Sequence, residues 1–183
     1  MGMSAPVYYT ADMVRALPDD GRRYEVVRGE LLVSPAPRPW HQEVVWRLAR
    51  ALDEYLQRNR VGHLFFSPAD ISWGSHDTLV QPDLFVVPLE EARTMSWDAM
   101  RTLLLVIETL SPTTRRADRF TKRSEYQRRQ VPVYWIVDPE NERVEVWVPD
   151  AEFPKLESER VTWLPAGAAE PFVMDLRELF RPL

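Results

Sequence analysis

The chain has 183 residues, 45 % of them hydrophobic and 28 % charged, and this length and composition predict one soluble globular domain over residues 1–183. It contains no cysteine, so disulfides and thiolate metal sites are excluded. The sequence shows no signal-peptide pattern and no apolar run long enough to cross a bilayer. These features together predict a cytoplasmic protein without a membrane partner. The formal net charge of −5 argues against nucleic-acid binding over the whole surface.

The first part of the chain predicts a short helix, two strands and one long helix. A helix is expected after Thr10, a good N-cap residue, and it ends before Pro18. Residues 24–33 predict two strands joined by a glycine turn, and three prolines then impose an extended connection. From Trp40 to Arg58, apolar residues recur every three or four positions, which predicts an amphipathic helix.

The rest of the chain alternates strands with helices. Helices are expected over residues 113–129 and 175–180. The alternation in residues 143–148 is typical of an edge strand or a half-covered strand. Strand patterns occur at residues 63–67, 70–73, 83–87, 104–110, 133–138, 143–148 and 161–164. These elements predict an α/β (α+β) fold, in which a mixed β-sheet is flanked by few helices.

Two of the predicted strands carry a carboxylate among apolar residues. Asp83 stands in QPDLFVV at residues 81–87, and Glu108 stands in LLVIETLSP at residues 104–112. A carboxylate inside a buried strand costs several kcal/mol unless it is paired or bound to a cation. Two such strands suggest that Asp83 and Glu108 come together to hold a hard divalent cation such as Mg²⁺ or Mn²⁺.

The segment from Thr113 to Arg129 is strongly basic. It has seven Lys or Arg residues against two acids, so its charge is +5 and the rest of the chain carries −10. On a helix, Asp118, Lys122 and Tyr126 share one face, and a lysine beside a metal can orient the attacking water. A neighbouring stripe suits phosphate oxygens and consists of Arg115, Arg119 and Arg123. These groups suit metal-assisted cleavage of a phosphodiester.

A series of motifs then matches a known family in chain order. They are YEVVRGE at residues 24–30, SP at 34–35 followed by His41, QPD at 81–83, ETLSPTT at 108–114, the run 118–126 and VPVYWIVDP at 131–139. Over about residues 10–180, the chain resembles the Uma family of restriction-endonuclease-like proteins (domain of unknown function 820), in the PD-(D/E)XK nuclease superfamily. The resemblance implies a restriction-endonuclease-like mixed β-sheet flanked by helices.

The resemblance also implies roles for particular residues. Asp83 becomes the motif aspartate and Glu108 the motif acid, and both are the expected metal ligands. The superfamily's usual lysine position is Leu110 here, but the family resembled places its lysine on the following helix, where Lys122 stands. Glu25, near the end of an early strand, is a further candidate for ligation or water positioning. Supporting roles are expected for His41, Asp118 and Tyr126.

Each of these residues also has a structural interpretation. Asp83 could be satisfied by backbone amides or by an arginine. Glu108 could form a buried salt bridge with Lys122 or with an arginine. Glu25 could pair with Arg22 or Arg23. The basic cluster could be a solvated helix surface rather than a binding face.

The sequence therefore predicts a metal-dependent endonuclease that hydrolyses DNA, with Mg²⁺ (or Mn²⁺) as cofactor and DNA as partner. A single domain of this size does not easily cut both strands, so we expect a homodimer, to which an edge strand such as 143–148 could contribute. Two alternatives stay open. One is a catalytically inactive nuclease-fold protein with a nucleic-acid-binding or regulatory role, and the other is a metal-dependent phosphoesterase acting on RNA or a small nucleotide.

Overall fold

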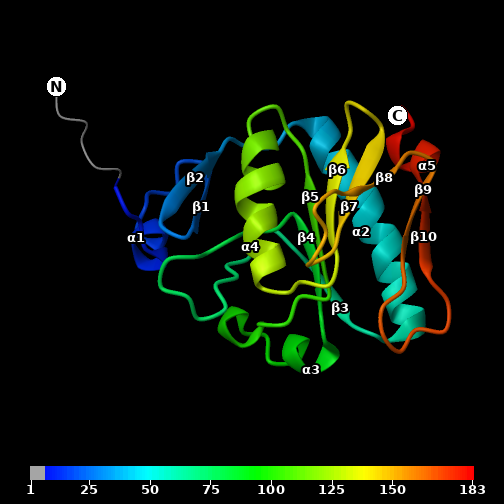
Figure 1. Ribbon diagram of the computed structural model, residues 1–183, viewed down its shortest axis with the longest axis horizontal. Coiled ribbons are helices and arrows are strands. Elements are labelled where there is room, and N and C mark those ends of the chain that lie inside the picture. The colour runs from blue at the N-terminus through cyan, green and yellow to red at the C-terminus, as the bar shows by residue number, and fades with distance from the viewer. Residues whose placement is uncertain (1–6) are drawn as a thin grey trace.

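The fold is built around a six-stranded mixed sheet with the order β3-β4-β5-β6-β7-β8 (Figure 1). The computed structural model describes residues 7–183, so the first six residues of the domain predicted over 1–183 lie outside it. Strands β5 and β6 are parallel, and the other neighbouring pairs are antiparallel. The strands are β3 (His63–Phe66), β4 (Leu84–Val87), β5 (Leu105–Thr109), β6 (Tyr134–Asp138), β7 (Arg143–Trp147) and β8 (Lys155–Glu157).

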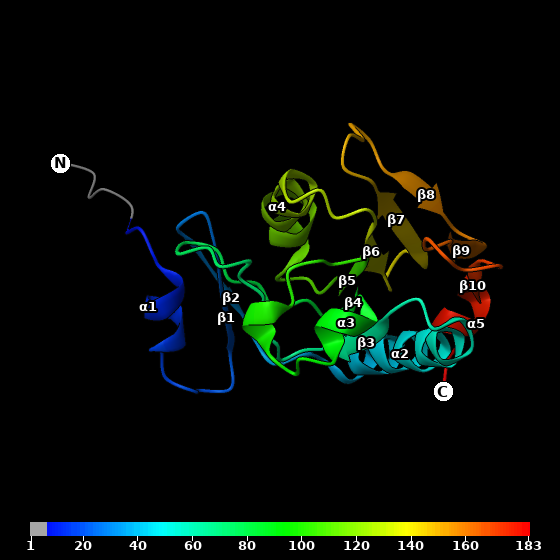
Figure 2. The same ribbon diagram turned by 90° about the horizontal axis from the view of Figure 1, so that it is seen from below.

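Helices cover both faces of this sheet, as Figure 2 shows with α2 (Pro39–Asn59) on one side and α4 (Arg123–Arg128) on the other. Alternate residues of β4 point to opposite faces of the sheet and pack in two different hydrophobic cores. Leu84 packs in the core that contains the apolar face of α2, whereas Phe85 packs in the core that contains Tyr126 of α4. Because both faces are covered, the central strands are nearly continuous apolar runs, which is the pattern that the sequence shows.

The long helix predicted from Trp40 to Arg58 is confirmed as α2. Pro39 stands in its first turn, where the missing N–H has no partner to lose. The helix ends at Arg60, which takes a left-handed conformation with φ 54°. Its apolar stripe is buried against the sheet, so the first turn of α2 is fixed beside the start of β4.

A separate hairpin, β1 (Arg23–Val27) with β2 (Glu30–Ser34), lies beside the main sheet. Its Val26 pairs with Leu79, just before the residues that lead into β4. Gly29 in the turn has φ +81°, and a Cβ there would lie 2.2 Å from the ring of Tyr8, so the turn requires glycine. The hairpin thereby brings β1 against the segment that carries Asp83.

The N-terminal and C-terminal elements complete the fold. Thr10 accepts a hydrogen bond from Met13 N at 3.1 Å and caps α1 (Ala11–Arg15), as predicted. Asp175 caps the last helix in the same way. The further elements are α3 (Leu89–Ala92), the 3₁₀ turn η1 (Trp97–Ala99), β9 (Arg160–Trp163), β10 (Phe172–Asp175) and α5 (Leu176–Phe180). No helix within residues 7–183 is long and apolar enough to cross a membrane.

Three local expectations are wrong. Residues 70–73 form no strand beyond a single bridge between Ile71 and Val80. Residues 143–148 are no edge, because β7 pairs with β6 on one side and with β8 on the other. Their alternation reflects polar groups that meet the basic segment, since Glu145 pairs with Arg119. The outer strands of the sheet are β3 and β8.

The third correction concerns the helix expected over residues 113–129. Its middle part, η2 (Ala117–Lys122), is a π-helix that leads into α4. Arg123 N–H donates to the carbonyl of Asp118, five residues earlier, instead of four. The wider turn shifts the side chains relative to a regular α-helix, and such segments occur frequently at functional sites.

Candidate active site

Lys122 lies at the centre of a buried group of carboxylates. Its Nζ is 2.8 Å from Glu25 Oε2, 3.0 Å from Glu108 Oε1 and 3.4 Å from Asp118 Oδ1. None of these side chains is more than 2 % exposed. An ammonium group has three N–H donors, so the three carboxylates together match its whole donor capacity.

Three separate elements place these groups. Glu108 comes from β5, Lys122 and Asp118 come from η2, and Glu25 comes from β1 of the hairpin. The other oxygen of Glu25, Oε1, accepts a hydrogen bond from Gln81 N at 2.7 Å. Glu25 therefore links Lys122 to the segment that precedes Asp83. The alternative pairing of Glu25 with Arg22 or Arg23 is not formed, because its two oxygens face Lys122 and Gln81 N instead.

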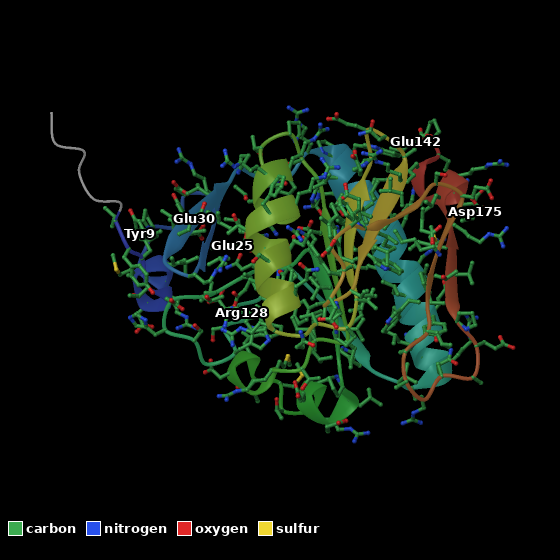
Figure 3. All side chains as sticks on the ribbon, viewed as in Figure 1. Tyr9, Glu25, Glu30, Arg128, Glu142 and Asp175 are labelled. Carbon is green, nitrogen blue, oxygen red and sulfur yellow. The ribbon has the colours of Figure 1, made fainter. Side chains whose placement is uncertain are left out.

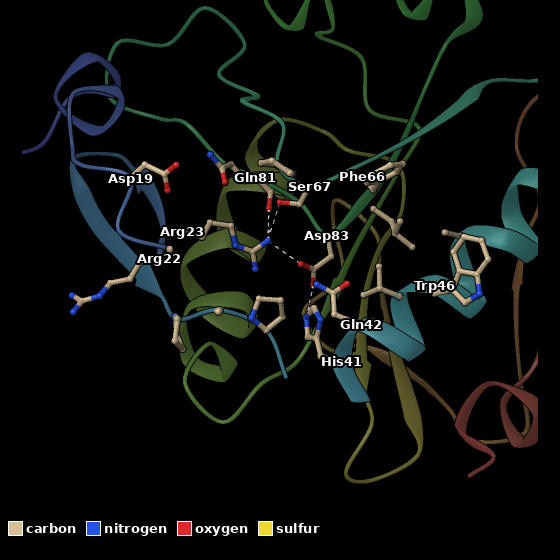
Figure 4. A pocket seen from close by; sticks show the side chains of 18 residues that line it. Asp19, Arg22, Arg23, His41, Gln42, Trp46, Phe66, Ser67, Gln81 and Asp83 are labelled. Carbon is tan, nitrogen blue, oxygen red and sulfur yellow. Dashed lines mark hydrogen bonds and ion pairs between the residues drawn. The ribbon is translucent and has the colours of Figure 1, made fainter. Parts of the chain in front are cut away.

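Asp83 directly precedes β4 and is buried beside this group. Its Oδ2 accepts a hydrogen bond from Thr109 N at 2.8 Å, so its carboxylate touches the backbone next to Glu108. The same oxygen lies 3.1 Å from His41 Nε2, and Oδ1 accepts from Arg23 Nη1 at 2.9 Å (Figure 4). The structure thus brings Asp83 and Glu108 to one place, each with a cation of the chain attached.

Two further residues contact the Lys122–Glu108 pair: Tyr126 contacts Glu108, and Asp118 contacts Lys122. The hydroxyl of Tyr126 donates to Glu108 Oε1 at 3.1 Å, the oxygen that also faces Lys122. Asp118 Oδ1 faces Lys122 at ion-pair distance but makes no hydrogen bond with residues 7–183. The predicted shared face of Asp118, Lys122 and Tyr126 therefore exists in spite of the π-helical turn.

The charges of the group do not balance. Four buried carboxylates, those of Glu25, Asp83, Glu108 and Asp118, face two cations, Arg23 and Lys122. Two negative charges are therefore in excess when all four acids are ionised and His41 is neutral. Burial, opposed by Lys122 but aided by the neighbouring acids, raises the pKa of Glu108 to about 8. Burial also raises the pKa of Asp118 above its usual value.

The pKa values of Lys122 and Asp83 are shifted in the direction that keeps each group charged at neutral pH. Burial lowers the pKa of Lys122, but the surrounding carboxylates outweigh it and raise that pKa above its usual value. Burial likewise raises the pKa of Asp83, but the hydrogen bond from His41 and the charge of Arg23 outweigh it and hold that pKa below its usual value. Lys122 is therefore a hydrogen-bond donor and a positive charge at neutral pH, and it cannot act as a base.

The group fits a hard divalent cation in its chemistry. Within residues 7–183, no three His, Asp or Glu side chains are arranged so that they could hold a metal ion as they lie. Mg²⁺, however, is usually bound through one or two carboxylates and completes its shell with water and phosphate oxygens. Asp83 and Glu108 supply such oxygens, and the four buried carboxylates outnumber the two cations beside them.

Two cavities adjoin the group. The larger, of about 540 Å³, is lined by Asp83, Arg23 and His41 and is shown in Figure 4. The smaller, of about 210 Å³, is lined by Glu25, Asp118 and Lys122. The site is thus reached from two directions, one ending at Asp83 and the other at Lys122.

The predicted arginine stripe does not join this group. Arg119 pairs with Asp138 at 3.0 Å and with Glu145 at 2.7 Å. Arg115 pairs with Glu140, and the guanidinium of Arg123 lies 4.5 Å from the ring centre of Trp147. In this arrangement the stripe fastens η2 and α4 to β6, β7 and their connecting turn, so a DNA phosphate would compete with these contacts.

Arg23 is a site residue that the sequence reasoning did not select. Its Nη1 contacts Asp83 Oδ1, the carbonyl of Gln81 at 3.0 Å and Ser67 Oγ at 3.2 Å. A signal was present, because Arg23 and Glu25 are two positions apart on a strand and therefore point to the same side.

A mixed sheet flanked by helices, with one buried acid on β5 and another directly before β4, is the arrangement predicted for a protein of the restriction-endonuclease-like class. The model of the family Uma2, described as putative restriction endonuclease, matches residues 11–172, so the chain belongs to this family. Both the predicted family and the predicted fold class are confirmed.

A solved structure shows the same fold. It is that of a putative nuclease belonging to DUF820 from Anabaena variabilis ATCC 29413, with a TM-score of 0.79 and 19 % sequence identity. The similarity covers 94 % of this chain and 97 % of that chain. No protein of curated function matches the sequence.

Proposed function

We propose that this protein is a metal-dependent endonuclease that hydrolyses phosphodiester bonds in DNA. The observation that carries the proposal is the buried group of four carboxylates, those of Glu25, Asp83, Glu108 and Asp118, around only two cations, Lys122 and Arg23. A group of this kind costs folding free energy, so a purely structural role does not account for it. Membership of a family of putative restriction endonucleases supports the nuclease class.

Asp83 and Glu108 are the residues that would hold Mg²⁺ or Mn²⁺. Such an ion, when bound, lowers the pKa of its water and neutralises charge on the phosphate. Burial and the neighbouring acids raise the pKa of Glu108 to about 8, and a bound divalent cation would lower it again by favouring the ionised carboxylate. His41 keeps Asp83 in place through Nε2, at the same carboxylate oxygen that accepts the hydrogen bond from Thr109.

Lys122 positions the attacking water as a donor. Its contact with Asp118 is the longest of its three, and Asp118 Oδ1 has no hydrogen-bond partner within residues 7–183, so a water would take over the N–H on this side most easily. Glu25 assists by holding Lys122 through Oε2 and the chain before Asp83 through Oε1. Tyr126 restrains Glu108 by its hydroxyl hydrogen bond.

The proposal has three further parts. DNA phosphates meet the basic segment, including the stripe of Arg115, Arg119 and Arg123. Two copies act together so that both strands are cut, and the outer strands β3 and β8 are the sheet edges open to such pairing. The protein acts in the cytoplasm, whose reducing conditions suit a chain without cysteine.

Cleavage of supercoiled plasmid with Mg²⁺ or Mn²⁺ tests this function. We expect the wild type to nick and linearise the plasmid, and Glu108→Gln and Lys122→Ala to lose about 100-fold or more in rate. Matched controls are Glu178→Gln and Lys155→Ala, whose side chains are 69 % and 73 % exposed and lie outside the site. Both controls should cleave as the wild type does.

The assay also separates the alternatives. An intact plasmid with every variant, together with no metal binding by calorimetry, would overturn the nuclease proposal. DNA binding without cleavage would favour a catalytically inactive, regulatory nuclease fold. Hydrolysis of RNA or of small nucleotides alone would favour a phosphoesterase.

A further inference from the structure

We propose that the 540 Å³ cavity beside Asp83 receives one unpaired nucleotide of the DNA, with its base stacked against Trp46 and Phe66. The substrate class would then be DNA with a nucleotide that is single-stranded or turned out of the duplex next to the cleaved bond. This inference rests on the proposed nuclease function and deepens it.

The cavity has the size and shape of a ligand site. Small-molecule sites are concave and typically enclose about 300–1,000 Å³, a range that includes this cavity. One wall is a face of α2, from which residues at helical spacing line the cavity, and the opposite wall is the end of β3. The α2 residues are His41, Gln42, Val45, Trp46 and Ala49.

The two large aromatic side chains at this cavity are exposed. Trp46 is 61 % exposed and Phe66 is 67 % exposed, so neither serves the hydrophobic core. Within residues 7–183, neither ring stacks on another aromatic ring or on a guanidinium, in contrast to Trp40, which lies under Arg47. Their faces are therefore available to a flat ligand from outside.

The cavity also has a polar end. Figure 4 shows Arg23, Gln81 and Asp83 on one side and Trp46 on the other. A nucleotide likewise has an apolar part and a charged part. The faces of its base are flat and largely apolar, and its phosphate is charged. The amide of Gln42, which also lines the cavity, can reach the polar edge of a base.

Stacking on protein aromatics requires an unpaired base. In a duplex, the faces of each base are covered by its neighbours, so a base reaches a pocket only in a single strand or after it turns out of the stack. Aromatic stacking of this kind tolerates every base, because each has a π-face. The polar end of the cavity includes the motif acid Asp83, so a nucleotide seated here would lie directly beside the scissile phosphate.

Binding without cleavage tests the inference. The full-length protein is titrated in EDTA with oligonucleotides that carry the fluorescent base 2-aminopurine, either in a single strand, unpaired within a duplex, or in a fully paired duplex. We expect the unpaired forms to bind about tenfold or more tightly than the paired duplex, with quenching of the 2-aminopurine fluorescence as it stacks.

Substitutions of the two aromatic residues test where the base binds. Trp46→Ala and Phe66→Ala should each weaken binding of the unpaired forms by roughly 5- to 150-fold and leave the paired duplex unchanged. Trp46→Phe keeps an aromatic face and should retain the quenching. Phe153→Ala is the matched control, because Phe153 is 81 % exposed and does not line the cavity. Since all these side chains are exposed, their removal should not unfold the protein.

The outcomes separate this inference from the proposed function. Equal affinity for paired and unpaired DNA, or no effect of Trp46→Ala and Phe66→Ala, overturns the inference even if plasmid cleavage persists. Selective, aromatic-dependent binding of the unpaired forms supports it, even if the wild type fails to cleave and the nuclease proposal falls.

Discussion

Lys122 and Glu108 form a buried ion pair of 3.0 Å, with side chains 2 % and 1 % exposed, although one comes from η2 and the other from β5. The pair is not isolated, because Glu25 of β1 contacts the same ammonium. A single cation thereby holds the hairpin, the central sheet and the π-helical turn together. Stability and site geometry are consequently coupled through one residue.

Replacement of this cation should therefore destabilise the protein strongly. We expect Lys122→Met to lower the free energy of unfolding by about 3–5 kcal/mol near pH 8, because it leaves buried carboxylates without their partner. Urea denaturation measures the change. Lys155→Met, on the exposed end of β8, should cost less than about 0.5 kcal/mol. Equal stability of Lys122→Met and wild type would show that the buried acids are already neutral.

The stability of the metal-free protein should fall as pH rises from about 5 to about 8. The pKa of Glu108 is about 8 in the folded protein against 4.5 for an ordinary glutamate. Below pH 4.5 the folded and unfolded states both hold the proton of Glu108, and its contribution to stability is complete. Between pH 4.5 and about 8 only the folded state holds this proton, so stability declines as pH rises. Above about pH 8 the contribution is lost. The raised pKa of Asp118 adds in the same sense.

Unfolding curves across this pH range check the sign. The slope from Glu108 is at most about 1.4 kcal/mol per pH unit, and Glu108→Gln should remove it. The lowered pKa of Asp83 acts only in acid, where stability is lost as pH falls through that pKa. Stability that rises from pH 5 to 8 in the metal-free protein would contradict the assignment.

Loss of the Tyr126 hydroxyl should affect the site in a way that another buried tyrosine does not. Tyr126→Phe removes the donor to Glu108 Oε1, so we expect a loss of about 1–2 kcal/mol in stability and a raised pKa of Glu108, which extends the slope of stability against pH further above pH 8. Tyr134→Phe is the matched control, because its hydroxyl donates to the backbone carbonyl of Asp118 at 3.1 Å. That variant should lose similar stability without a change in the pH slope. The same slope change in both variants would mean that the effect is general.

His41 should matter for activity more than for folding. Its Nε2 lies 3.1 Å from Asp83 Oδ2 and orients that carboxylate. Loss of a group that orients a metal ligand typically costs about 10- to 100-fold, so we expect His41→Ala to reduce plasmid cleavage by that factor. The control is His63→Ala, because His63 is exposed on β3 and should be silent. Wild-type cleavage by His41→Ala would remove His41 from the site.

Arg119 makes two intramolecular ion pairs and is also proposed to meet a DNA phosphate, so one variant tests both roles. Its guanidinium joins Asp138 and Glu145, so Arg119→Ala removes one charged hydrogen-bond partner from each of two buried carboxylates and should cost about 1–3 kcal/mol. If Arg119 instead contacts a phosphate, DNA affinity will fall and the slope of log affinity against log salt will shrink by about one unit. Filter binding at several salt concentrations, with urea denaturation of the same variant, decides between the two roles.

Much of the fold follows from local patterns. The buried runs that became β4, β5 and β6 and the amphipathic repeat that became α2 are periodicities of the sequence itself. The strand predicted at residues 70–73 does not form, because Ile71 is buried with no more than a single bridge to Val80. The edge assignment of β7 failed because alternation also arises where an inner strand meets charged groups, as Glu145 meets Arg119.

The sequence by itself determined which side chains carry the candidate chemistry. Asp83 and Glu108 stand out because a carboxylate in an apolar strand is costly, and Lys122 stands out by its spacing from Asp118 and Tyr126. Only the tertiary structure decided which charged groups pair with one another. Lys122 contacts three carboxylates, and Arg23 contacts Asp83, which lies 60 positions away in the sequence. The physical reason is that periodicity reports which side of an element is buried, whereas ion pairing depends on where elements distant in sequence meet.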